Sequence, residues 1–454
     1  MTEKEFDVIV IGAGPAGEVA AGRLAEAGED VALCERELVG GECSFYACMP
    51  SKALLRPSEL IGEVGRVPGI ELASGIPTAS AVLERRDEIV HDLDDSAQIP
   101  WLEERDIQLF RSEARLDGER RVIAGEDILT ARKAVIIATG TVAALPPIPG
   151  LAEADPWTSR EGTTSNEVPE SLIVIGGGPV GCELAQAWHS LGADVVLLEM
   201  APRIISMEEE FASAELAEAL TDAGIDVRTD VKITNAAGEN GRVHVTLEGD
   251  ETIEAEKLMV AAGRRPNTGS IGLDTVGVKE GDWIEVDDQL RVNGLDWLYA
   301  IGDVNKRSLL THSGKYQSRV VSENILGRAA TAKADVKGPP RVTFTDPQIA
   351  AVGLTAEQAE ENGIDVETID VSTSGNAGAS FHGRDTSGTS RLVIDKDREI
   401  VVGATFVGYQ TAELLHSASI AIAGEVPMRK IAEAIPAFPT RTEIWLRMTE
   451  KYGI

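Results

Sequence analysis

The chain has 454 residues, of which 75 are acidic and 42 basic, so its formal net charge is −33 at pH 7. This negative charge disfavours nonspecific binding to nucleic acid or to anionic membranes, and no apolar run reaches the roughly 18 residues that a membrane span needs. The length predicts about two to four domains, and the acidic start at residues 1–5, which lacks a basic signal region, predicts a cytoplasmic location.

A nucleotide-binding unit opens the chain. The β-rich run 7–11 leads into Gly12-Ala13-Gly14-Pro15-Ala16-Gly17, and a helical pattern follows over 18–27. This is the dinucleotide-binding fingerprint in its required context, with the pyrophosphate expected at the helix N-terminus. A second strand, 31–34, ends at Glu35, whose carboxylate is placed to accept hydrogen bonds from ribose hydroxyls.

Two cysteines follow this unit, Cys43 and Cys48. Cα atoms five residues apart on a regular helix are roughly 8 to 9 Å apart, which exceeds the roughly 7 Å that a disulfide spans. We therefore expect Cys43 in a distorted turn before a helix that has Pro50 in its first turn. A bridge held there would be strained and easily reduced, so the pair is interpreted as a redox-active disulfide. A structural staple remains the alternative, and the lack of nearby cysteine or histidine ligands argues against a metal site.

The nucleotide-binding pattern occurs a second time. The strand 173–175 leads into Gly176-Gly177-Gly178-Pro179-Val180-Gly181 and a helix over 182–191, and the next strand, 195–198, ends at Glu199. Glu35 lies 23 residues after Gly12, and Glu199 lies 23 residues after Gly176. One such motif is weak evidence, but two copies with strand, helix and correctly spaced acid predict two dinucleotide sites.

The order of the two units predicts which dinucleotide each one holds. A flavin is the usual mediator between a nicotinamide hydride and a disulfide, so the unit before the cysteines is expected to hold FAD and the second to hold NAD. Glu199 favours NADH, because a carboxylate would repel the extra phosphate of NADPH. Arg203 leaves NADPH open, because an arginine can accommodate that phosphate.

Small residues end the closing strands of both units, at Thr139-Gly140 and at Gly263. Such residues let the backbone pass close to a ligand, so all three are predicted to contact a cofactor. A later strand, 298–302, ends at Asp303, which is available to another sugar hydroxyl.

Proline and glycine clusters divide the chain further. The predicted fold class is α/β, with two Rossmann-like domains and a C-terminal α+β domain. Strand-like runs in that last domain, 391–394 and 400–403, alternate with helical stretches at 412–423 and 428–434. The predicted domains are a discontinuous FAD-binding domain at 1–149 and 270–337, an NAD(P)-binding domain at 150–269, and a third domain at 338–454.

The whole chain resembles the pyridine nucleotide-disulfide oxidoreductases, the family of dihydrolipoamide dehydrogenase, glutathione reductase and mercuric reductase. Residues 41–52 are similar to the redox centre of that family, 263–268 to the turn that ends its nicotinamide unit, and 301–303 to its second FAD motif.

This resemblance implies roles for individual residues. Cys48 would be the sulfur that faces the flavin and Cys43 the thiol that exchanges with substrate. Lys52 and Glu183 resemble the ion pair beside the flavin ring, although Glu183 could also be a solvated helix position. Gly41 would belong to the FAD site, as would Thr311 and His312, whose helix start would face the pyrimidine end of the flavin. The third domain would form a homodimer interface.

One position departs from the family. Disulfide-reducing members carry a histidine-glutamate pair near the C-terminus, with the histidine as acid and base for the exchange thiol. Here Glu443 is present, but Phe438 stands at the histidine position, and none of the six histidines lies beyond His416. Mercuric reductase also lacks that histidine, yet its C-terminal cysteine pair is absent from residues 451–454.

The sequence therefore predicts an FAD-dependent, NADH-preferring oxidoreductase that passes hydride equivalents through a Cys43–Cys48 disulfide to an unidentified disulfide or small acceptor. One alternative is an NAD(P)H-dependent quinone or metal-ion reductase in which the disulfide is dispensable. Another is a flavin-bearing redox sensor with negligible turnover.

Overall fold

The computed structural model describes residues 2–70, 75–384 and 386–454. The chain forms two compact units, each assembled from three segments. The first unit comprises Met1–Pro50, Asp87–Ala143 and Arg264–Val336, and the second comprises Ser51–Arg86, Ala144–Gly263 and Lys337–Ile454.

A seven-stranded sheet forms the centre of the first unit. Its strands are ordered β3-β2-β1-β6-β5-β4, with β16 also paired to β6. The contacts among β1, β2, β3, β6 and β16 are parallel, and β4 to β6 are antiparallel. The strands are β1 (Glu3–Ile11), β2 (Val31–Glu35), β3 (Gln108–Arg111), β4 (Ala114–Leu116), β5 (Arg121–Ala124), β6 (Asp127–Ile137) and β16 (Leu298–Ala300).

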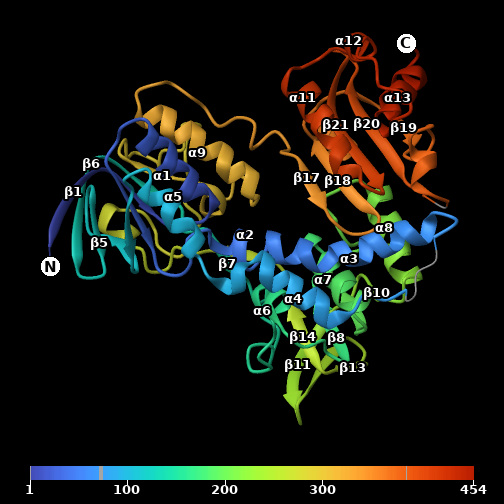
Figure 1. The fold of residues 1–454 in the computed structure, drawn as a ribbon, viewed down its shortest axis with the longest axis horizontal. Coiled ribbons are helices and arrows are strands. Elements are labelled where there is room, and N and C mark those ends of the chain that lie inside the picture. Colours follow the sequence, from blue (N-terminus) through green and yellow to red (C-terminus); the bar gives the residue numbers. More distant parts are fainter. Residues whose placement is uncertain (1, 71–74, 385) are drawn as a thin grey trace. The chain divides into compact units, whose positions relative to one another are not determined.

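Helices α1 (Pro15–Glu26) and α9 (Thr311–Ile325) lie side by side in this unit, as Figure 1 shows. Buried residues of both helices join β1 and β2 in one hydrophobic core. The unit also contains α2 (Gly41–Phe45) and α5 (Ile99–Glu103), together with the start of α3 (Cys48–Arg66). The chain leaves the unit through β7 (Thr141–Ala143) and returns through β15 (Arg264–Pro266), and these two strands pair with each other.

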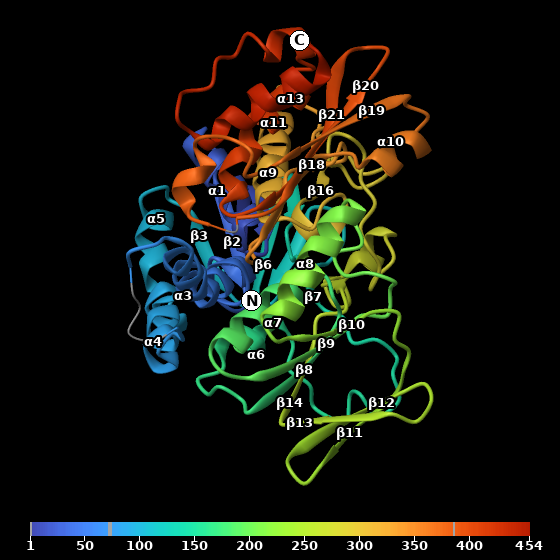
Figure 2. The same ribbon diagram turned by 90° about the vertical axis from the view of Figure 1, so that its right-hand side faces the viewer.

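The second unit repeats the nucleotide-binding topology on a smaller scale. Its parallel sheet has the order β10-β9-β8-β14. A three-stranded antiparallel sheet, β11-β12-β13, accompanies it (Figure 2). The strands are β8 (Ser171–Ile175), β9 (Asp194–Leu198), β10 (Asp226–Arg228), β11 (Ile233–Glu239), β12 (Arg242–Leu247), β13 (Thr252–Ala255) and β14 (Lys257–Val260), and the helices are α4 (Ala79–Ile89), α6 (Ser159–Thr164), α7 (Pro179–Ser190) and α8 (Glu210–Asp222).

A five-stranded antiparallel sheet, ordered β17-β18-β21-β20-β19, forms the C-terminal part of the same unit. Helices α11 (Leu415–Ala423) and α13 (Ile444–Tyr452) bury Ala418, Trp445 and Met448 against it. The remaining elements are β17 (Arg341–Thr343), β18 (Gln348–Gly353), β19 (Val366–Ser372), β20 (Thr389–Asp395), β21 (Ile400–Gly408), α10 (Ala356–Glu361) and α12 (Met428–Ile431). The predicted helices at 412–423 and 428–434 are present but shorter, because a 3₁₀ turn occupies Thr411–Leu414 and α12 ends at Ile431.

Candidate functional site

The two cysteines occupy two consecutive helices. Cys43 lies inside the short helix α2, and Cys48 is the first residue of α3. Cys43 thus lies before the helix that has Pro50 in its first turn, as predicted, but in a short helix of its own, and the chain breaks after it, at Tyr46 with φ −131° and ψ −3°. Because of this break, the two cysteines can approach each other more closely than they could in one regular helix.

Both cysteines are free thiols in this structure. The Cys48 Sγ lies 3.4 Å from the Thr311 Oγ1 at the start of α9. The pKa of the Cys43 thiol is raised, first by its hydrogen bond with Cys48 and then by burial, while Thr311 and Lys315 lower it. Cys43, Cys48 and Thr311 thus form one cluster within the first unit.

Lys52 and Glu183 form an ion pair within the second unit, with 2.6 Å between Nζ and Oε2. The Glu183 side chain is buried, which rules out a solvated helix position, and its Oε1 accepts the backbone N–H of Phe344 at 2.9 Å. The Lys52 ammonium also lies 4.8 Å from the centroid of the Phe344 ring, within the range of a cation–π interaction.

The two glycine-rich loops are built alike. Helices α1 and α7 begin with Pro15 and Pro179, and within the described ranges no side chain caps either N-terminus. Glu35 accepts the backbone N–H groups of Ala13 (2.7 Å) and Glu37 (2.8 Å). Glu199 makes the corresponding bonds to Gly177 (2.6 Å) and Ala201 (2.7 Å).

The glycines of both loops leave room for a phosphate group. A Cβ built on Gly14 or Gly178 would meet no heavy atom of any residue that the structure describes within 4 Å, so the backbone N–H groups at both helix starts face open space. By contrast, a Cβ on Gly17 or Gly181 would lie 1.9 or 1.8 Å from the carbonyl oxygen of Gly12 or Gly176, so these glycines are needed for close packing. Both loops therefore fit a dinucleotide pyrophosphate.

A second cluster surrounds Asp303. Thr141 donates to the Asp303 Oδ2 at 2.8 Å, and the Arg264 Nε donates to the Thr141 Oγ1 at 2.5 Å and lies 3.9 Å from Asp303. Burial raises the pKa of Asp303, and Thr141 and Arg264 lower it. The other end of the Arg264 guanidinium pairs with Glu42, which directly precedes Cys43.

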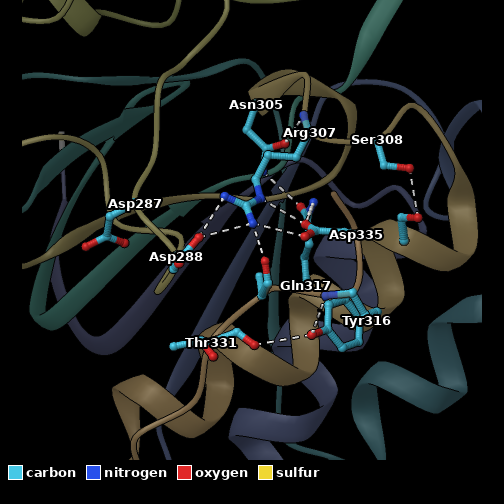
Figure 3. Close-up of polar contacts among 12 residues, drawn as sticks. Asp287, Asp288, Asn305, Arg307, Ser308, Tyr316, Gln317, Thr331 and Asp335 are labelled. Atoms are coloured by element: carbon cyan, nitrogen blue, oxygen red, sulfur yellow. Dashed lines mark hydrogen bonds and ion pairs between the residues drawn. The ribbon is translucent and has the colours of Figure 1, made fainter. Parts of the chain in front are cut away.

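A buried polar network holds the backbone turn that contains Asp303 (Figure 3). Gln317 accepts the Gly302 N–H at 2.8 Å and the Asn305 amide at 2.9 Å, and donates to Asp335 at 2.8 Å. Arg307 donates to both oxygens of Asp335 at 3.0 Å. This network therefore ties the Asp303 turn to the body of α9.

The remaining predicted cofactor residues lie at loop positions. The Thr139 Oγ1 is buried and has no hydrogen-bond partner among the described residues, as expected of a group that a ligand would satisfy. Gly140 and Gly263 have φ of +66° and +122°, and a Cβ on either would meet open space. His312 is exposed in the first turn of α9.

The C-terminal segment contains Phe438, which the resemblance places at the family's histidine position, and Glu443. The Phe438 side chain is 77% exposed, whereas Glu443 is buried. The Glu443 Oε2 has no hydrogen-bond partner in the part of the chain that the structure describes.

Sequence reasoning missed most residues of the cluster around Asp303 and of the network that holds its turn: Glu42, Thr141, Arg264, Asn305, Arg307, Gln317 and Asp335. Glu42 lies inside the motif at 41–52 and Arg264 inside the motif at 263–268. A charged residue within each motif is the sequence signal that could have identified them. No group of three or more histidine, cysteine or acidic side chains in the described residues is arranged to hold a metal ion. Among those residues, no helix has the length and apolar character needed to cross a bilayer.

Two dinucleotide cradles and a dithiol define a flavin- and nicotinamide-dependent oxidoreductase. Family models agree: residues 6–325 match pyridine nucleotide-disulphide oxidoreductase, and residues 339–449 match the dimerisation domain of the same family. The chain belongs to this family.

Relatives from two functional groups match almost the whole chain. Mercuric reductase of Staphylococcus aureus is 32% identical over 97% of this chain and 81% of its own length. Dihydrolipoyl dehydrogenase of the same species is 32% identical over 98% of this chain and 96% of its own length. The flavoprotein disulfide reductase RclA of Escherichia coli has the same fold, with a TM-score of 0.87 and 24% identity over 98% of this chain and 99% of that one.

Family membership settles the general activity. The chain is an oxidoreductase that uses FAD and NAD(P)H and carries out NAD(P)H-to-FAD-to-disulfide transfer, and it forms a homodimer. The predictions of family, fold class, cofactors and enzyme class are confirmed.

Proposed function

We propose that this enzyme uses NADH to reduce a disulfide or small electron acceptor through the Cys43–Cys48 pair, with Cys43 as the exchanging thiol. The observation that carries the proposal is the cluster of both sulfurs with Thr311 at the N-terminus of α9. FAD, when bound, supplies the two-electron carrier between a nicotinamide hydride and this disulfide.

Each proposed step at the cysteines uses atoms of this chain. The Cys43 thiolate attacks a sulfur of the acceptor disulfide, which forms a mixed disulfide and releases one thiolate. The Cys48 thiolate then attacks Cys43, which re-forms the Cys43–Cys48 bond and releases the second thiolate. Thr311 and the N-terminus of α9 favour negative charge on Cys48. Two electrons leave the pair in each cycle.

Further roles are proposed for the surrounding residues. Lys52 and Glu183 form the ion pair beside the flavin ring, and Glu35 and Asp303 hold FAD hydroxyls. Glu199 holds a ribose of the nicotinamide dinucleotide. NADH is preferred because both Glu199 oxygens are anchored at the loop, while Arg203 donates to the Glu208 carbonyl at 2.8 Å.

The assignment is tested by anaerobic titration with NADH while the absorption spectrum is recorded. A long-wavelength band from a Cys48 thiolate beside the flavin supports it, and direct bleaching without such a band counts against it. A parallel titration with NADPH tests the coenzyme preference.

A second candidate is a quinone or metal-ion reductase in which the disulfide is dispensable. It is favoured by the similarity to mercuric reductases and by Phe438, because a missing proton-transfer group typically costs a factor of about 10² to 10⁴ in thiol chemistry. A Cys43→Ser variant separates the two functions. Loss of turnover supports the disulfide route, and undiminished turnover with a quinone or metal ion supports the second candidate.

We also propose the domain division given above, with FAD bound by 1–149 and 270–337, NAD by 150–269, and the dimer interface in 338–454. A cytoplasmic location belongs to the same proposal. Limited proteolysis tests the boundaries, and fractionation of the source cells tests the location.

A further inference from the structure

The N-terminal turns of α1, α2 and α9 lie close together. A Cβ on Gly41, at the start of α2, would lie 2.7 Å from the Gly14 Cα before α1. A Cβ on Gly314, in α9, would lie 3.1 Å from the Ala16 Cβ of α1, and the Ser318 Oγ of α9 donates to the Ala16 carbonyl at 2.7 Å. Helix α1 therefore lies close to both α2 and α9.

Lys315 is a cation on the side of α9 that faces the cysteines. It lies four residues after Thr311, so the two side chains point the same way along the helix, and Thr311 contacts the Cys48 sulfur at 3.4 Å. The Lys315 side chain is exposed and forms no ion pair with any described residue. Its charge is therefore not neutralised by a bonded carboxylate.

The other charged groups near Cys43 are already engaged. Glu42, on the same helix, pairs with Arg264 of β15, which also contacts Thr141 and Asp303. From α3, Cys48 raises the pKa of Cys43, and from α9, Thr311 and Lys315 lower it. From α1, the half-buried Glu18 faces Lys315, and Glu35 acts on Glu18 in turn.

We propose that Lys315 stabilises the Cys43 thiolate from within the same subunit, in place of the histidine that Phe438 replaces. The proposal rests on the proposed function, in which Cys43 is the exchanging thiol. Ionisation of Cys43 releases one proton to solvent and moves no electrons. Lys315 is a positioning residue here, because it acts through the sulfur of Cys43.

The test measures Cys43 alone, without any acceptor. The FAD-loaded protein in its dithiol form is alkylated with iodoacetamide across a pH series, and peptide fragmentation assigns the label to Cys43. Lys315→Gln is expected to raise the midpoint of this pH profile by about one unit, the effect of one nearby charge. The fraction of Cys43 present as thiolate at pH 7 then falls about tenfold. The alkylation rate falls by less, about threefold to fourfold, because a more basic thiolate is also more nucleophilic.

Two variants of α9 serve as controls. Lys315→Arg keeps the charge and is expected to restore the wild-type profile. Arg319→Gln removes one exposed charge a turn further along the helix and is expected to leave the profile unchanged. An unchanged midpoint in Lys315→Gln, or an equal shift in Arg319→Gln, overturns the proposal.

A variant that is expected to shift the Cys43 midpoint in the opposite direction distinguishes an electrostatic effect from loosened packing. Glu18→Gln removes the carboxylate that faces Lys315, so above about pH 7 it is expected to lower the Cys43 midpoint. Loosened packing would shift both variants in the same direction. Failure of the proposed function is recognised separately, because Cys43→Ser would then keep full turnover whatever the alkylation profile shows.

Discussion

Phe438 stands, by the resemblance to the family, where disulfide-reducing members carry a histidine. It is exposed on a segment whose Glu443 is buried, with one carboxylate oxygen that no described residue pairs. By the same resemblance, Glu443 is the member of a histidine-glutamate pair that this chain keeps.

We expect Phe438→His to restore proton transfer to the exchange thiol. The kcat/KM for dihydrolipoamide or glutathione disulfide should rise by about tenfold or more, a part of the 10² to 10⁴ that a positioned acid–base group supplies. Steady-state kinetics across pH measure the gain, with Phe438→Leu as the control that keeps the position apolar. An equal gain in the leucine variant would show that bulk, rather than proton transfer, limits the wild type.

Glu18 should make stability depend on pH. Burial raises its pKa from 4.5 to about 7, so between these values the folded protein holds a proton that the unfolded chain has lost. The contribution of Glu18 to the free energy of unfolding is thus fully present below pH 4.5 and is lost as the pH rises through about 7. We expect Glu18→Gln to gain about 1–2 kcal/mol relative to wild type over that interval, after discounting for partial exposure. Urea unfolding at both pH values measures the gain, and a difference that does not change with pH contradicts it.

At the scale of elements, those that a local sequence pattern specifies could be predicted, whereas contacts between distant parts of the chain could not. The strand–loop–helix units at β1–α1 and β8–α7 could be predicted because each lies within one short segment with its own glycines and acid. The link between Glu42 and Arg264 joins residues 222 positions apart, so no local pattern indicates it. Disulfide geometry predicts a break in the helix near the two cysteines. It does not predict that the break falls after Cys43, because the five residues of α2 are enough to form a helical turn that contains Cys43.

The network beneath the Asp303 turn should control FAD retention. Gln317→Leu removes the acceptor for the Gly302 N–H and the Asn305 amide, leaving two buried donors unpaired. Each such group costs about 1–3 kcal/mol, so the FAD dissociation constant is expected to rise at least tenfold. Fluorescence of released FAD measures this change. Tyr316→Phe, which removes only a hydroxyl at 3.2 Å from the Thr331 carbonyl, is the matched variant and should retain FAD.

At the scale of the whole molecule, the charge excess cannot be neutralised internally. If all 42 basic side chains were paired one to one with acids, 75 − 42 = 33 acidic side chains would remain. An acid excess of this size is compatible with adaptation to salt and equally with an acidic proteome, and these two explanations differ in whether the fold itself depends on screening.

We expect salt to stabilise the folded enzyme. Raising KCl from about 0.1 M to about 1 M shortens the screening length from about 10 Å to about 3 Å, which weakens repulsion among the excess carboxylates. The thermal unfolding midpoint of the FAD-loaded protein should rise by several degrees, as differential scanning fluorimetry can measure. Potassium sulfate at equal ionic strength distinguishes screening from general salting-out, because only the latter makes sulfate much more effective than chloride. A midpoint that stays flat or falls with KCl would mean that repulsion among these carboxylates does not limit stability, and the acidic composition would then act on solubility alone.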